Sequence, residues 1–176
     1  MELEQLLTDL QGRYLSAYEA TYHENVSQFD QFTPEVVLEI SGGVYRKLYV
    51  ADFVGRTGAD FKVVEVDPGF GCGRIRIEYN DVTIEFDSVS WDAMDIRSDP
   101  EISDLVGFDE WFSRWLEFDR TPRTGEIASG MIHSVVIDGV ARSIDFGTAP
   151  PAAAIELFEL YRSSGAKRIV VTDSRQ

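Results

Sequence analysis

Cys72 is the single cysteine of the chain and a candidate nucleophile, and it lies in the glycine-rich stretch PGFGCG at residues 68–73. A phosphate-binding loop needs its glycines to open a helix, whose N-terminal amides hold the anion, whereas a strand pattern follows this stretch. We therefore expect a connection with an incidental thiol and no nucleotide site. A nucleophilic Cys72 would also need a base such as His133 or His23 beside it, which the sequence does not place there.

His133 alternates with Met131, Val135 and Ile137 on the more apolar face of a predicted strand. A histidine in this setting is usually hydrogen-bonded within a core. His23 follows the first predicted helix, where a cation near the helix C-terminus is favoured. Because two histidines and one cysteine show no close ligand spacing, we predict no metal site, no cofactor and no catalytic residue.

Asp145 and Asp173 stand at the ends of two predicted strands that we expect to run parallel. Carboxylates at such positions could converge on a hard cation, and Thr148 with the start of the following helix could help to bind a phosphate. This arrangement would be typical of a metal-assisted hydrolase. The structural alternative places Asp145 in a turn and Asp173 in a frayed tail.

An acidic region in the middle of the chain is the feature most indicative of function. The net charge is -15, and residues 52–119 hold 17 acids and 6 bases, whereas residues 120–176 hold 6 acids and 7 bases. Such a field repels nucleic acid and attracts a basic protein, and aromatic side chains within an acidic rim are typical of interfaces. We predict partner binding by the following residues: Trp91, Asp92, Asp95, Asp99, Glu101, Asp104, Asp109 and Glu110.

In composition the chain resembles the toxin-neutralising immunity proteins of bacteria, which are small, acidic and without catalytic motifs. The resemblance covers no diagnostic motif. It implies a basic protein partner, such as a toxin domain. The carboxylates of this chain would then occupy the groove in which the toxin binds phosphates. Two other hypotheses are the metal-assisted hydrolase and a structural or oligomeric subunit that pairs through an edge strand or the first helix.

The size and composition predict a globular protein. With 176 residues, 44% of them hydrophobic, the chain fits a single domain over 1–176, in which residues 126–176 either extend the first sheet or form a subdomain. No apolar run of about 18 residues indicates a membrane span. The acidic N-terminus is unlike a signal peptide, and the single cysteine permits no internal disulfide, so we expect a cytoplasmic location.

The clearest structural pattern is a β-hairpin over residues 73–91 with its turn at Asn80-Asp81. This register fills one face with apolar pairs and the other with opposite charges. The predicted pairs are Tyr79 with Val82, Ile77 with Ile84, Ile75 with Phe86, Arg76 with Glu85, and Arg74 with Asp87.

Five such strands, over residues 36–41, 44–54, 60–67, 73–79 and 82–91, predict an antiparallel meander covered by amphipathic helices, which is an α+β fold. The first two would join at Gly42-Gly43, with Glu39 opposite Arg46. A short helix that begins at Thr33-Pro34-Glu35 is the alternative for residues 34–41. After Trp91, we expect residues 92–110 to form an acidic surface loop.

Helical periodicity predicts a helix over residues 2–22 and a second one from residue 108, whose Trp111 and Trp115 are more typical of core positions than of an interface. The C-terminal end predicts a β-hairpin–helix–strand unit. Its turn would be Asp138-Gly139, with Ile137 opposite Val140 and Val135 opposite Arg142. Thr148 would cap the helix, which Gly165 would end, and residues 142–146 and 167–172 would run parallel.

Overall fold

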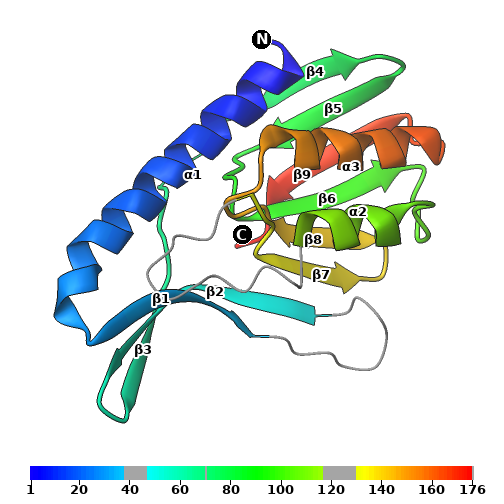
Figure 1. The fold of residues 1–176 in the computed structure, drawn as a ribbon. Helices are drawn as coiled ribbons and strands as arrows, with labels where there is room; N and C mark the ends of the chain where they lie inside the picture. Colours follow the sequence, from blue (N-terminus) through cyan, green and yellow to red (C-terminus); the bar gives the residue numbers. More distant parts are fainter. Residues whose placement is uncertain (38–46, 70, 117–129, 176) are drawn as a thin grey trace.

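Three α-helices and nine strands form the described part of the chain, residues 1–37, 47–69, 71–116 and 130–175 of a computed structural model (Figure 1). The helices are α1 (Leu3–Asn25), α2 (Phe108–Leu116) and α3 (Pro151–Ser163), and a 3-10 turn, η1 (Val26–Gln28), follows α1. The strands are β1 (Gln31–Val37), β2 (Lys47–Thr57), β3 (Asp60–Val64), β4 (Ile75–Tyr79), β5 (Val82–Asp87), β6 (Met94–Asp99), β7 (Ser134–Asp138), β8 (Ala141–Asp145) and β9 (Arg168–Asp173). The predicted α+β class is confirmed.

The strands follow the order β1-β2-β7-β8-β6-β9-β5-β4, and β3 also pairs with β2. One edge of β2 is occupied by β1, so β7 and β3 share the other edge. β7 pairs with Leu48 near the start of β2, and β3 pairs with β2 from Phe53 onward. The sheet therefore forks in the middle of β2, and Figure 1 shows β3 standing away from β7 and β8.

The five predicted strands form two separate antiparallel groups and not one continuous meander. β1, β2 and β3 lie at one end of the sheet, and β4 and β5 lie at the other, because later strands insert between them. Residues 34–37 belong to β1, so the alternative helix is not formed there. The predicted turn at Gly42-Gly43 and the pair of Glu39 with Arg46 lie outside the described residues.

The β4–β5 hairpin has the predicted register, including Ile77 opposite Ile84. The charges also pair as predicted, because a guanidinium nitrogen of Arg74 lies 2.5 Å from Asp87. The β7–β8 hairpin differs, and its pairs are shifted to Ile137 with Arg142 and Val135 with Ile144. The turn begins at Gly139 with φ of 60°, so glycine takes the first central position, as in a type II′ turn.

The predicted loop 92–110 is partly wrong, because its first part is strand β6. Met94, Ile96 and Ser98 alternate inward, and β6 pairs with both β8 and β9. As predicted, β8 and β9 run in the same direction, but β6 lies between them. The C-terminal strands therefore belong to the same sheet as β5 and β2.

The helices bury the faces that their periodicity predicts. In α1 the buried side chains include Leu7, Tyr14 and Tyr18, and α3 lies between α1 and α2 (Figure 1). The N-cap of α3 is Pro150 and not Thr148, whose hydroxyl lies 3.4 Å from the backbone of Met131. Among the described residues, no helix combines the length and the apolar character needed to cross a membrane.

Candidate functional site

Trp91, the aromatic member of the predicted partner-binding region, belongs to the core. Only 1% of its surface is exposed, and its ring packs 4.9 Å from that of Phe146. Its indole nitrogen donates a hydrogen bond of 2.9 Å to the Gly147 carbonyl. Trp111 is also buried and donates to the Ala153 carbonyl of α3 at 2.8 Å. Both tryptophans stabilise the fold, and their rings offer almost no exposed surface to a partner.

Asp92 and Asp95 are also largely removed from the surface. Asp92 lies 3.2 Å from a guanidinium nitrogen of Arg175, and burial raises the pKa of its carboxyl. Asp95 accepts hydrogen bonds from Ser143 at 2.8 Å and from Arg97 at 3.0 Å. Because protein cations and a hydroxyl already hold them, these two carboxylates contribute little to an attractive surface.

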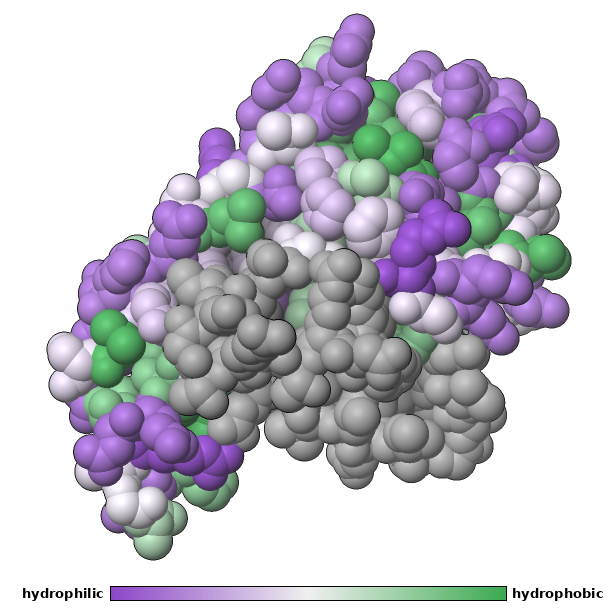
Figure 2. Space-filling view, viewed as in Figure 1, coloured by the Kyte–Doolittle hydropathy of each residue, from purple (hydrophilic) through white to green (hydrophobic). Residues whose placement is uncertain are grey.

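The remaining five predicted carboxylates are exposed, and we call them the acidic face: Asp99, Glu101, Asp104, Asp109 and Glu110. They lie between the end of β6 and the first turn of α2. Val106, which is 80% exposed, lies among them. Figure 2 shows mainly hydrophilic side chains, with a few hydrophobic ones, over the side of the molecule where α2 and α3 lie.

A groove runs beside the acidic face, between α2 and α3. It combines apolar side chains with carboxylates and is lined by Gly107, Glu110, Trp111, Arg114, Ile155, Glu156, Glu159 and Leu160. An ion pair of 2.9 Å between Arg114 and Glu156 links the two helices. The groove and the acidic face share Glu110, so they form one continuous surface.

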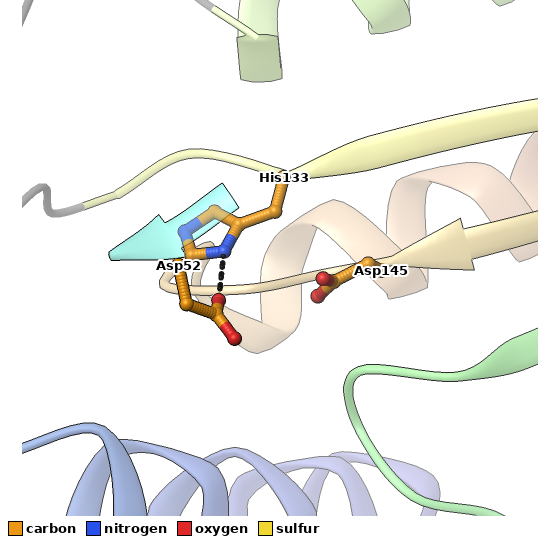
Figure 3. A group of neighbouring side chains, drawn as sticks. All are labelled: Asp52, His133 and Asp145. Carbon is orange, nitrogen blue, oxygen red and sulfur yellow. Dashed lines mark hydrogen bonds and ion pairs between the residues drawn. The ribbon is translucent and has the colours of Figure 1, made fainter. Parts of the chain in front are cut away.

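Four polar side chains inside the molecule form a second candidate site, which we call the buried centre: Tyr14, Asp52, His133 and Asp145. Figure 3 shows Asp52, His133 and Asp145 side by side. The Nδ1 atom of His133 lies 2.9 Å from Oδ1 of Asp52. Tyr14 donates its hydroxyl hydrogen to the same oxygen at 2.7 Å. His133 is fully buried, and these contacts satisfy its Nδ1 atom, whereas its Nε2 atom has no hydrogen-bond partner among the described residues.

The fold brings these residues together from four separate elements. Asp52 lies in β2 at the fork of the sheet, where its second oxygen accepts the Val66 amide at 2.8 Å. His133 immediately precedes β7, and its amide donates to the Asp145 carbonyl at the end of β8 at 2.9 Å. A Cβ atom on Gly147, whose φ is 48°, would lie 2.1 Å from the imidazole ring, so a glycine is required there.

The charges of the buried centre shift one another's pKa values. Burial lowers the pKa of His133, but its bond to Asp52 and the nearby carboxylates outweigh burial and raise it. Burial opposes ionisation of Asp52, but the bond to His133 prevails and lowers its pKa. For Asp145, burial and the Asp52 charge raise the pKa to about 7, although His133 acts against them. Burial and the two carboxylates raise the pKa of Tyr14, which therefore remains a neutral donor.

The buried centre also has the donor set of a metal site. Asp52, His133 and Asp145 each offer one ligand atom, and these atoms lie within 4.8 Å of one another. Asp173, the predicted partner of Asp145, does not belong to this site, because β6 lies between the strands that carry the two aspartates. A guanidinium nitrogen of Arg175 holds Asp173 at 2.7 Å. The structure therefore joins Asp145 with a different aspartate and with His133.

The other two candidates show no comparable arrangement. Cys72 is half-buried, its amide donates to the Val89 carbonyl at 2.9 Å, and burial raises the pKa of its thiol. The His23 ring lies edge-on to Tyr22 at 5.6 Å.

The expectation that His133 is a hydrogen-bonded core residue is confirmed, but the sequence did not indicate its partner Asp52. The available signal was an aspartate within the strand pattern YVADFVG, because aspartate is depleted in strands.

No protein-family model matches this chain, and neither a curated protein nor a solved structure shows significant similarity to it.

Proposed function

We propose that this protein is a non-enzymatic binding protein that docks on a basic protein and neutralises it through the acidic face and the adjoining groove. The observation that carries the proposal is the composition of residues 99–115, in which five exposed carboxylates accompany a single base, Arg114. Arg114 is already paired with Glu156 of α3. The negative charge of the acidic face is therefore available to a cationic partner.

Electrostatic attraction explains the rate and orientation of such binding. Complementary charges raise association rate constants to about 10⁸–10⁹ M⁻¹s⁻¹ at low salt, from about 10⁵–10⁶ M⁻¹s⁻¹ without steering. Asp109 and Glu110 also stabilise the first turn of α2 through the helix dipole. Glu101 and Asp104 precede the helix. Stabilisation of its first turn therefore does not account for the presence of these two carboxylates.

The groove supplies the apolar contact that charge alone lacks. Ile155 and Leu160 lie in its lining together with Glu110 of the acidic face. Lysine and arginine side chains pack their aliphatic stems on apolar surface and keep the charged end at a carboxylate. A basic segment of the partner is thus the occupant whose chemistry fits this surface.

The compositional resemblance to immunity proteins supports a toxin domain as the partner, and the lone cysteine supports a cytoplasmic location. In that setting the acidic face would cover the cationic surface with which the toxin binds phosphates. Neutralisation would follow from occupancy of that surface.

Affinity capture with three versions of the chain tests the proposal. The first is the unmodified protein, and the second carries Glu101→Lys and Asp104→Lys. The third carries Glu19→Lys and Asp60→Lys, which change the net charge equally at exposed positions outside the acidic face. We expect the first and third proteins to capture the same basic protein and the second to lose it. Equal capture by all three proteins would contradict the proposal.

A further inference from the structure

We propose that the buried centre is a binding site for one divalent transition-metal cation, with Asp52, His133 and Asp145 as its ligands. One imidazole nitrogen and two carboxylate oxygens lie within 4.8 Å of one another and come from separate parts of the sheet. Figure 3 shows the two carboxylates on the side of the imidazole that carries Nδ1. This site lies apart from the acidic face and is independent of the proposed function.

The ligands are held in position by a second layer of hydrogen bonds. Tyr14 and the Val66 amide fix the two oxygens of Asp52, at 2.7 and 2.8 Å. The Gly147 amide donates to Asp145 at 2.8 Å. Partners of this kind orient metal ligands and reduce the reorganisation that binding requires.

A buried hydroxyl beside the centre is left without a hydrogen bond. Tyr18 is 1% exposed, and its hydroxyl has no partner among the described residues. Its ring lies 6.0 Å from that of His133. Burial raises the pKa of this hydroxyl, and the nearby charges of Asp52 and Asp145 add to the rise. A water molecule on a bound cation would give this hydroxyl the partner that buried polar groups normally have.

The donor set favours zinc or manganese over magnesium or calcium. One imidazole nitrogen suits zinc, and two carboxylate oxygens suit manganese, whereas magnesium and calcium prefer oxygen ligands alone. Ligands placed at about 2.1 Å from zinc lie roughly 3.4 Å from one another. Nδ1 of His133 and Oδ1 of Asp52, now 2.9 Å apart, would therefore move slightly apart, and Asp145, whose ligand atom lies within 4.8 Å of both, completes the set. On binding, Nδ1 of His133 would give its lone pair to the cation, and the proton that it shares with Asp52 would pass to solvent.

Thermal unfolding of the chelator-treated full chain, with each cation added in turn, tests the site. A cation at a hundred times its dissociation constant should raise the melting temperature by about 5–10 °C. We expect this shift with zinc or manganese, and a much smaller one with magnesium or calcium. Asp145→Asn should abolish it, whereas Asp173→Asn, at the end of β9 and outside the site, should retain it. The absence of any shift, or the same shift in Asp145→Asn as in the unmodified chain, would overturn the proposal.

A second measurement needs no change within the site. Because the chain has two histidines, His23→Gln leaves His133 as the only source of imidazole NMR signals. One equivalent of zinc should move these signals to a new position. Signals that stay in place through one equivalent of zinc would show that His133 is not a ligand.

Discussion

Asp145→Asn should stabilise the metal-free protein more at pH 8 than at pH 5. Burial and the charge of Asp52 raise the pKa of Asp145 from 3.8 to about 7. Folding therefore favours the protonated carboxyl, and the ionised form is costly. Asparagine resembles the protonated form in shape, and its oxygen can still accept the Gly147 amide, which lies 2.8 Å from Oδ1.

The magnitude follows from the size of the pKa change. A rise from 3.8 to about 7 corresponds to an upper value of about 4 kcal/mol in the free energy of unfolding. Because Asp145 is partly exposed and interacts with His133, we expect about 2 kcal/mol. A raised pKa means that stability is lost as the pH rises from about 4 to about 7. The raised pKa of His133 acts in the same direction, because its contribution is lost as the pH rises through its folded pKa.

Urea unfolding at pH 5 and pH 8, with a chelator present and tryptophan fluorescence as the signal, measures this difference. Asp173→Asn is the control of opposite sign, because Arg175 overcomes the effect of burial and lowers the pKa of Asp173. That variant should be less stable than the unmodified protein at both pH values. If Asp145→Asn lowers the free energy of unfolding equally at pH 5 and pH 8, the assigned charge state of the buried centre is wrong.

Three further substitutions test how the structure is held together, each by urea unfolding. Gly147→Ala should cost about 3 kcal/mol or more, because its Cβ atom would lie 2.1 Å from the ring of His133 at a positive φ; a loss below 1 kcal/mol would contradict this packing. Tyr14→Phe should cost about 1–2 kcal/mol through the lost hydrogen bond to Asp52, and an unchanged midpoint would show that the bond is absent. Arg175→Gln should cost about 2 kcal/mol, because it leaves two largely buried carboxylates without their cation; full stability at pH 7 would refute the pairing.

Local patterns predicted most of the individual elements. The register of the β4–β5 hairpin follows from its turn and from its apolar and charged faces, which all agree. The apolar stripe of α1 and the stop of α3 at Gly165, with φ of 101°, follow from spacing and residue type. These features depend on residues close in sequence.

The strand order could not be predicted, because it depends on contacts between distant residues. β6 carries three charged residues in MDIRSD, which conceal the inward alternation of Met94, Ile96 and Ser98. Its insertion between β8 and β9 also separated Asp145 from Asp173. The buried centre was missed for the same reason, because Asp52 lies 81 residues from His133.

The most direct test of the proposed function is the association rate constant between this protein and its captured partner, measured at low and high salt. We expect the unmodified chain to associate rapidly at low salt and much more slowly at high salt. Glu101→Lys with Asp104→Lys should lower the low-salt rate at least tenfold, whereas Glu19→Lys with Asp60→Lys should lower it far less. Equal rates for the two variants, or a rate that does not depend on salt, would contradict docking through the acidic face.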